Sequence, residues 1–262
     1  TLLGKQIGET KFSLKLLPFG GACMMGEDDA DDLSEGSFNS KSVWARMSVV
    51  AAGPIFNLIL ACVFCFILIM ITGYRSPEIT GVLDGYSAQE EGLQAGDVIT
   101  EINGRNVHIW DDVSLYTMTH ADEAPFKVEY ERDGKKYTAK LEPRQLEGDA
   151  APLLGVTSGD IVKPGIFKSV EYSIYKVKYW MNYTVDSLRM LVTGQAGLKD
   201  LSGPVGIVNA VDDMYQEAAP AGFGVVMLSM MNFGVLLTTN LGILNLLPLP
   251  ALDLSLIHIS EP

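Results

Sequence analysis

The stretch Asn245-Leu246-Leu247-Pro248-Leu249-Pro250-Ala251-Leu252-Asp253 decides how the chain is organised, because it closes a long uncharged run and ends on a lone carboxylate. The run begins at Ala218. As one helix rising ~1.5 Å per residue it would reach about 52 Å, well beyond a ~30 Å hydrocarbon core. Pro248 and Pro250 remove backbone donors and bias the preceding residues away from helix. We therefore expect a helix over roughly residues 222–244, followed by a broken, extended segment that delivers Asp253.

The carboxylate at the end of this run is a candidate functional group. Broken backbone at membrane depth survives only where protein or a water-filled cavity satisfies its polar groups. An ionisable side chain in such a place is a functional-site candidate by default. From the residues alone, the alternative is a proline-rich helix end with Asp253 at the membrane interface.

The motif Asn245-x-x-Pro248-x-Pro250-x-Leu252-Asp253 resembles the third-segment motif of the site-2 protease family of intramembrane zinc metalloproteases. It is most similar to the bacterial branch that processes anti-sigma factors. In that family the motif continues with Gly-Gly, and its Asp is the third zinc ligand. The resemblance implies that Asp253 binds Zn²⁺ and that Asn245 helps to hold substrate backbone near the metal.

A second uncharged run, from Met47 to Tyr74, is long enough for one tilted membrane span within residues 43–75. It contains Gly53-Pro54-Ile55-Phe56-Asn57, and a proline there can kink the helix while an asparagine in hydrocarbon seeks a partner. The pattern resembles the family's second-segment signature, which implies that Gly53 and Asn57 lie close to the active site and contact substrate. The alternative is a kink that serves helix packing.

Composition indicates a membrane protein that carries a soluble module. Hydrophobic residues make up 48% of the 262 positions, and the formal net charge of −13 argues against nucleic-acid binding, which needs a basic surface. Cys62 and Cys65 have CxxC spacing but lie inside a membrane run without further ligands. We interpret them as small apolar helix residues, not as a zinc or redox site.

Residues 1–42 predict a β-hairpin followed by an acidic loop. Lys11 to Leu16 alternates polar and apolar residues, Gly20-Gly21 marks a turn, and the hairpin is expected over residues 5–25. The pattern resembles the family's membrane-associated hairpin on the cytoplasmic side, which would guide substrate as an added strand. An ordinary edge hairpin is the alternative. The acidic run at residues 27–32 lacks the spacing of a calcium loop and is expected to be solvated.

Residues 76–145 resemble a bacterial PDZ domain inserted between the two spans. The matching positions are Gly92, Gly96, Asp97, Asn103 and Gly104, the last two a strong hairpin signal. The resemblance implies an α+β, partly open barrel with a helix over residues 110–119 beside a peptide groove. Such domains bind chain ends by strand addition, although some serve only as plugs or spacers. His108 and His120 are expected on the surface of this part.

Residues 146–217 are expected to form a linker up to residue 165 and then an amphipathic helix. A helical stripe of apolar residues begins after Ile166, with tyrosines, a tryptophan and lysines beside it. That composition suits a membrane interface, and a core helix under the PDZ domain is the alternative. The stripe comprises Phe167, Val170, Ile174, Val177, Met181, Val185, Leu188 and Leu191. Leu201 to Ile207 then resembles a Leu-Ser-Gly-Pro-x-Gly-Ile element of the family.

The chain departs from the family at both ends. The family's first span carries His-Glu-x-x-His, which supplies two zinc ligands and a general base. The histidines here, His108, His120 and His258, do not form that pattern, so we expect it upstream of Thr1. A catalytic zinc normally has three protein ligands, and we predict that the chain as given is inactive. Residues 254–262 replace the expected Gly-Gly and match one reading frame of a sequencing adapter, so we interpret them as a non-native tail.

These patterns together predict a partial membrane α-helical core, spans at 43–75 and 218–253, with an inserted PDZ domain and a membrane-associated hairpin. The resemblance implies a zinc endopeptidase of the bacterial cytoplasmic membrane, multi-pass, with the PDZ domain outside the cytoplasm. Its partners would be the lipid bilayer, a transmembrane substrate such as an anti-sigma factor and, at the PDZ domain, peptide C-termini. The alternative function is a non-catalytic membrane scaffold that presents a peptide-binding PDZ domain.

Overall fold

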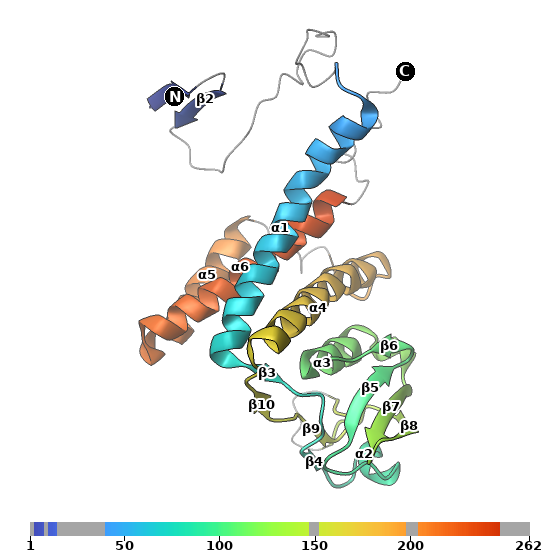
Figure 1. The fold of residues 1–262 in the computed structure, drawn as a ribbon. Coiled ribbons are helices and arrows are strands. Elements are labelled where there is room, and N and C mark those ends of the chain that lie inside the picture. The colour runs from blue at the N-terminus through green and yellow to red at the C-terminus, as the bar shows by residue number, and fades with distance from the viewer. Residues whose placement is uncertain (1–2, 8–9, 15–39, 147–151, 198–203, 247–262) are drawn as a thin grey trace. The chain divides into compact units, whose positions relative to one another are not determined.

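The computed structural model describes residues 3–7, 10–14, 40–146, 152–197 and 204–246 (Figure 1). The chain divides into two compact units, one before Val50 and one that begins there. Each unit is described separately.

The first unit contains an antiparallel hairpin and the beginning of a helix. Strand β1 (Leu3–Ile7) pairs with β2 (Thr10–Leu14), and Ile7 lies opposite Thr10. The strand expected from Lys11 onward therefore exists, but its partner precedes it in the chain. The expected turn at Gly20-Gly21 and the acidic run at 27–32 lie outside the described residues.

Two long apolar helices match the two uncharged runs. Helix α1 spans Val43–Thr72 and α6 spans Phe223–Leu246, and an 18-residue stretch of each has a mean hydropathy of 2.8 and 1.5, respectively. Both helices are long and apolar enough to cross a membrane. Only 17% and 22% of the residues in these stretches are buried within the protein. The prediction of a helix over about 222–244 is thus confirmed almost to the residue. A helix satisfies its own backbone groups, which is why an uncharged run at membrane depth takes this form.

Helix α4 (Ile166–Val192) packs beside α1 and α6 in the second unit. A shared cluster joins Ala61 and Cys65 of α1, Val177 of α4 and Val235 of α6. Helix α5 (Pro204–Ala218) and the short 3₁₀ helix η3 (Ala219–Ala221) lead into α6. Pro204 opens α5, where a missing N–H leaves no helix bond unmade.

An α+β module, which we call the inserted module (residues 76–160), lies between α1 and α4 in the chain (Figure 1). Its main sheet has the strand order β6-β5-β7-β8, all antiparallel, and a separate pair joins β4 to β9. Strand β3 (Tyr74–Arg75) pairs with β10 (Ile161–Val162) where the chain enters and leaves the module. The remaining elements are β4 (Gly81–Val82), α2 (Ser87–Glu90), β5 (Val98–Ile102), β6 (Arg105–Asn106), α3 (Trp110–Thr119), η1 (Ala121–Glu123), β7 (Phe126–Arg132), β8 (Lys135–Leu141) and β9 (Val156–Thr157).

The module has its own hydrophobic core, and that core corrects the linker prediction. Ile79, Ile99 and Phe126 are fully buried in it, and Leu154 from the expected linker joins the same cluster. Strands β9 and β10 also fall within residues 146–165. The linker interpretation was therefore wrong over these strands, because isolated pairs of strand residues give too short a pattern to read from sequence.

Candidate functional site

The signature residues of α1 lie against the second half of α6. Gly242 of α6 faces Pro54 and Leu58 of α1: a Cβ at Gly242 would lie 3.2 Å from the Leu58 side chain and 3.3 Å from the Pro54 carbonyl oxygen. Pro54 is buried within α1. Small residues let helix backbones approach closely in a membrane, and Gly242 has this role here.

A polar contact joins the same two helices one turn earlier on α6. The Thr238 hydroxyl donates to the backbone carbonyl oxygen of Asn57 at 3.3 Å. The side chain of Asn57 is half-buried, and among the described residues no hydrogen-bond partner is assigned to its amide.

Of the remaining predicted site residues in the membrane core, the structure describes Asn245 and Gly53 but not Asp253. Asn245 is half-buried in the last turn of α6, three residues after Gly242, and its amide likewise has no partner assigned within the described residues. Gly53 is exposed, and a Cβ there would meet no atom within 4 Å. Asp253, Pro248 and Pro250 lie outside the described residues. The structure thus brings the α1 signature next to the start of the α6 motif and leaves its end undescribed.

The described residues do not fit a zinc site. Within them there is no group of three or more His, Cys, Asp or Glu side chains that could hold a metal ion. His120 is engaged structurally: its Nδ1 lies 2.8 Å from the Thr119 hydroxyl and its ring stacks on Tyr116 at 4.3 Å. The expectation that His120 lies on the surface was wrong, since it is 6% exposed.

Helix α4 is joined to α6 by a part-buried polar contact. The Thr184 hydroxyl of α4 bonds to the side-chain oxygen of Asn240 on α6. Both residues lie one to two turns from the Asn245 end of the membrane core. Helix α4 therefore braces the half of α6 that carries the motif.

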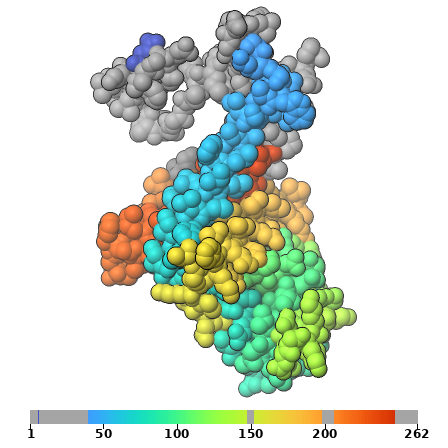
Figure 2. Space-filling model, in the orientation of Figure 1, coloured from blue at the N-terminus to red at the C-terminus, as the bar shows by residue number. Residues whose placement is uncertain are grey.

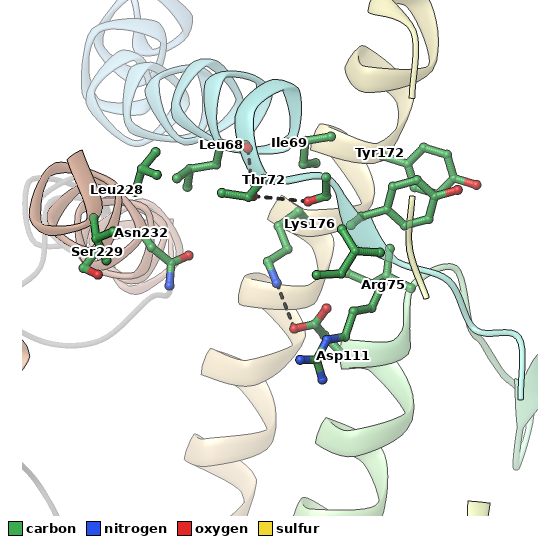
Figure 3. Close-up of a pocket in the computed structure, with 15 residues that line it drawn as sticks. Leu68, Ile69, Thr72, Arg75, Asp111, Tyr172, Lys176, Leu228, Ser229 and Asn232 are labelled. Carbon is green, nitrogen blue, oxygen red and sulfur yellow. Dashed lines mark hydrogen bonds and ion pairs between the residues drawn. The ribbon is translucent and has the colours of Figure 1, made fainter. Parts of the chain in front are cut away.

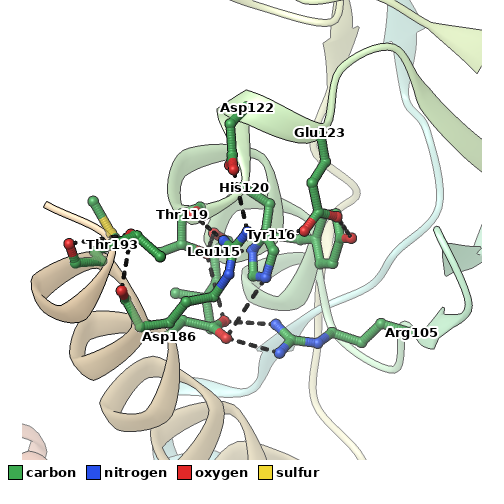
Figure 4. Close-up of polar contacts among 11 residues, drawn as sticks. Arg105, Leu115, Tyr116, Thr119, His120, Asp122, Glu123, Asp186 and Thr193 are labelled. Atoms are coloured by element: carbon green, nitrogen blue, oxygen red, sulfur yellow. Dashed lines mark hydrogen bonds and ion pairs between the residues drawn. The ribbon is translucent and has the colours of Figure 1, made fainter. Parts of the chain in front are cut away.

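The opposite side of α4 is clamped to the inserted module by Asp186 (Figure 4). Arg105 of β6 donates two hydrogen bonds to this carboxylate, at 2.6 and 2.9 Å, and the bond raises the pKa of the Arg105 guanidinium further above its ordinary value. Thr119 donates to it at 3.4 Å, and His120 Nε2 lies 3.8 Å away. Asp186 is 2% exposed. A buried carboxylate with this many partners fixes the module on α4.

Three further contacts extend the same interface. Arg189 of α4 donates to Glu123 at 3.0 Å and to the backbone oxygen of Thr119 at 3.2 Å. The ring of His108 stacks on Tyr175 at 3.9 Å. Burial, assisted by the nearby Lys178, lowers the pKa of His108. None of these pairs was predicted, because the partners lie far apart in sequence.

Half of the apolar stripe predicted for α4 is exposed, whereas Val177 is buried and the remaining three members are half-buried. Phe167 is 92% exposed, Ile174 56% and Val185 53%, whereas the buried positions are Ser169, Ser173, Val177, Thr184 and Asp186. The yellow atoms of α4 form part of the visible surface in Figure 2. The helix therefore meets the rest of the protein through small and polar residues together with Val177 and its apolar neighbours Trp180 and Met181. This arrangement favours the membrane-interface interpretation for the apolar face.

The residues singled out in the inserted module form turns and a buried ion pair. Asn103 and Gly104, with φ of 47° and 86°, make the β5–β6 turn, and Gly92 and Gly96 also have positive φ, which favours glycine. Asp97 is 1% exposed and accepts hydrogen bonds from Arg132 at 2.6 and 2.7 Å. Burial opposes its ionisation, but the bonds from Arg132 and the Gln94 amide outweigh it and lower the pKa of Asp97. These residues hold the module together.

A groove lies between α3 and β9, beside the helix at residues 110–119 where a peptide groove was expected, but its second wall comes from the expected linker. Its volume is about 680 Å³, and it is lined on one side by α3 and on the other by residues that include Leu153, Leu154 and Val156. Gly155 makes this wall possible: its φ is 85°, and a Cβ there would lie 2.1 Å from Tyr86 Cβ. In the sequence, Gly155 between two apolar residues of the expected linker is the feature that could have indicated a packed segment here.

Comparisons with known proteins cover nearly the whole chain. The family model described as Peptidase family M50 matches residues 1–257. A Clostridium acetobutylicum protein, whose name makes it a candidate zinc metalloprotease, is 36% identical over 252 residues, 96% of this chain and 72% of its own length. Zinc metalloprotease RasP of Bacillus licheniformis is 36% identical over 218 residues, 82% of this chain and 50% of that protein.

Two further matches concern a sigma-factor regulator and the inserted module. Regulator of sigma-W protease RasP of Bacillus subtilis is 35% identical over 219 residues, and this chain spans 50% of its length. The crystal structure of a PDZ domain from an SdrC-like protein of Listeria monocytogenes covers 33% of this chain and 87% of that domain, at 24% identity and a TM-score of 0.26. The family match over residues 1–257 and the identity to the Clostridium relative show that this chain belongs to peptidase family M50, a family of metalloproteases.

Proposed function

We propose that this chain is part of an intramembrane zinc metalloprotease that cleaves transmembrane proteins, and that its substrates are of the anti-sigma-factor type. One observation carries the proposal: the Gly53–Asn57 signature of α1 packs against α6 at Gly242, directly before the motif that begins at Asn245. Membership of peptidase family M50 supports it. The name of the Bacillus subtilis relative, a regulator of sigma-W, supports the substrate class.

Within this proposal, Asp253 is a metal ligand, and the side chains of Asn57 and Asn245 form hydrogen bonds with the substrate backbone. A substrate must be extended before its peptide bond is exposed, and an extended backbone offers unpaired N–H and C=O groups. The amides of Asn57 and Asn245 can each donate to and accept from such a backbone. Both are half-buried and without an assigned partner in the described part of the chain.

We propose that the other metal ligands belong to a His-Glu-x-x-His segment, a pattern that this 262-residue sequence does not contain. A catalytic zinc takes three protein ligands and a water. The chain alone is then inactive. The proposal also places the protein in the bacterial cytoplasmic membrane as a multi-pass protein, with the hairpin on the cytoplasmic side and the inserted module outside.

The decisive experiment uses the complete gene product and a model transmembrane substrate. Asp253→Ala should abolish cleavage and lower bound zinc, whereas Asn245→Ala should slow cleavage and leave zinc in place. Asn232→Ala is the matched control, because it removes the same amide from the same helix, about 20 Å away at ~1.5 Å per residue. Full zinc occupancy and activity in the Asp253 variant would remove that residue from the site. Loss of zinc in the Asn245 variant would show that Asn245 supports the metal instead of the substrate.

The α1–α6 contact has its own test. Gly242→Val adds a Cβ that would lie within 3.3 Å of the Leu58 side chain and the Pro54 carbonyl oxygen. Helices α1 and α6 must therefore move apart at this point, and cleavage should fall. Gly224→Val on the same helix is the control, since a Cβ there meets nothing within 4 Å. Equal activity in the two variants would separate the contact from the function.

A second function, peptide binding in the α3–β9 groove, is favoured by the groove's volume of about 680 Å³ and by its strand wall. We propose it as an accessory role, in which the inserted module takes chain ends by strand addition. Titration of the chain with peptides that carry a free or an amidated C-terminus tests it. Equal affinity for the free and the amidated peptide would indicate that the module is a plug or spacer. Peptide binding without proteolysis by the complete protein would favour the scaffold alternative.

A further inference from the structure

A cavity of about 520 Å³ lies at the other end of the membrane helices from the candidate site (Figure 3). The end of α1, the beginnings of α4 and α6, and strand β3 surround it, and Asp111 of α3 closes one side. The α6 residues that line it extend from Val225 to Asn232. Asn245 lies more than three helical turns further along α6. The cavity is therefore distinct from the site described above.

The cavity has an apolar floor and a charged rim. Leu68, Ile69 and Leu228 come from the membrane helices and form the floor. Lys176 and Arg75 provide positive charge at the rim. A ligand that fits both parts must be amphipathic, with an anionic group at one end.

The rim has one positive charge that is not paired with any carboxylate of the described residues. Lys176 is paired with Asp111 at 2.9 Å, and its side chain is 23% exposed. Arg75 is exposed, and no described carboxylate lies within ion-pair distance of it. A planar guanidinium binds a phosphate through two parallel hydrogen bonds, so Arg75 suits a phosphate group.

The position of the cavity along the helices fits a lipid headgroup. Helix α1 ends at Thr72 and α6 begins at Phe223, so both spans end at the cavity. Tyr74 and Tyr172 stack beside it with ring centroids 3.6 Å apart. Tyrosine and tryptophan gather at the level of the headgroups in membrane proteins.

We propose that this cavity binds one anionic phospholipid, with its phosphate at Arg75 and an acyl chain against Leu68 and Leu228. A free phosphate would gain nothing from the apolar floor, whereas each CH₂ of an acyl chain that is buried there strengthens the binding of a lipid. The neighbouring exposed apolar face of α4 keeps this end of the protein in contact with lipid. The occupant thus comes from the bilayer itself.

The test counts retained lipids on the 262-residue chain. The chain is placed in nanodiscs of phosphatidylglycerol and phosphatidylethanolamine, and native mass spectrometry measures which lipid stays bound after release. Wild type should retain phosphatidylglycerol preferentially. Arg75→Gln should lower that retention about fivefold, the effect of one interfacial cation. Lys178→Gln, on the same helix as Lys176 but exposed and outside the cavity lining, should change it less than about twofold by the same reasoning.

Two further measurements separate a built lipid site from general attraction to anionic lipid. Ser229→Phe fills the cavity without changing its charge and should abolish the retained lipid. Excess inorganic phosphate should not displace it. Equal losses in the Arg75 and Lys178 variants, unchanged retention in the Ser229 variant, or full displacement by phosphate would each overturn the proposal.

Discussion

The clamp between Arg105 and Asp186 makes an asymmetric prediction about how the inserted module is held on α4. Asp186 has a side chain that is 3% exposed, whereas that of Arg105 is 26% exposed. Removing Arg105 leaves a buried carboxylate whose remaining partners among the described residues are the Thr119 hydroxyl at 3.4 Å and His120 Nε2 at 3.8 Å. Removing Asp186 leaves a guanidinium that can turn toward water. The two halves of one ion pair should therefore differ in what their loss costs.

The magnitudes follow from that difference in burial. Arg105→Ala should weaken docking by about 3 kcal/mol, the low end for breaking a buried pair. Asp186→Ala should weaken it by about 1.5 kcal/mol, the net value of charge-assisted hydrogen bonds. The equilibrium constant for release of the inserted module from α4 should therefore rise about 150-fold in Arg105→Ala and about 12-fold in Asp186→Ala.

Hydrogen exchange of the chain in nanodiscs measures these changes, because amides at the interface exchange when the module opens from α4. Peptides that cover residues 116–124 and 182–190 should show the two accelerations. Arg144→Ala is the control, since its pair with Glu90 is on the surface and its loss should leave these peptides unchanged. Equal acceleration in both clamp variants, or less than about threefold in either, would refute the burial argument.

Two other predictions concern pH and backbone conformation. Burial and Lys178 of α4 lower the pKa of His108 in the structure, and we expect undocking to restore its ordinary value of about 6.5. Docking is then fully favourable above about pH 6.5 and weakens as pH falls through the lowered pKa, which hydrogen exchange between about pH 7 and 5 should show. His108→Phe, which keeps the stacking on Tyr175, should remove this pH dependence. Gly155→Ala combines a positive φ with a clash at Tyr86 and should destabilise the module by at least about 3 kcal/mol, whereas Gly134→Ala, with positive φ but open space, should cost about 1 kcal/mol. Denaturant titrations of the two variants compare them, and similar midpoints would show that residues 152–157 move aside at little cost.

Local patterns were enough to predict the membrane helices and the turns of the inserted module. An uncharged run at membrane depth must satisfy its backbone internally, so α1 and α6 could be placed from charge and length alone. The Asn103-Gly104 turn depends on two adjacent residues that tolerate positive φ. The family resemblance itself was confirmed by the family match over residues 1–257. Asp253 and the zinc ligand set stay predictions.

Only the tertiary structure decided which faces meet and which charges pair. Arg105 and Asp186 are 81 residues apart, and Thr238 and Asn57 are 181 apart, so no periodicity within a helix or strand relates them. The apolar stripe of α4 was visible in sequence, but its direction was not, because the same stripe can pack on protein or face lipid. The buried positions show that α4 turns Ser169, Ser173, Thr184 and Asp186 inward together with Val177, so the apolar stripe is divided between core and surface. Buried polar groups need specific partners, and those partners exist only once distant segments have been brought together.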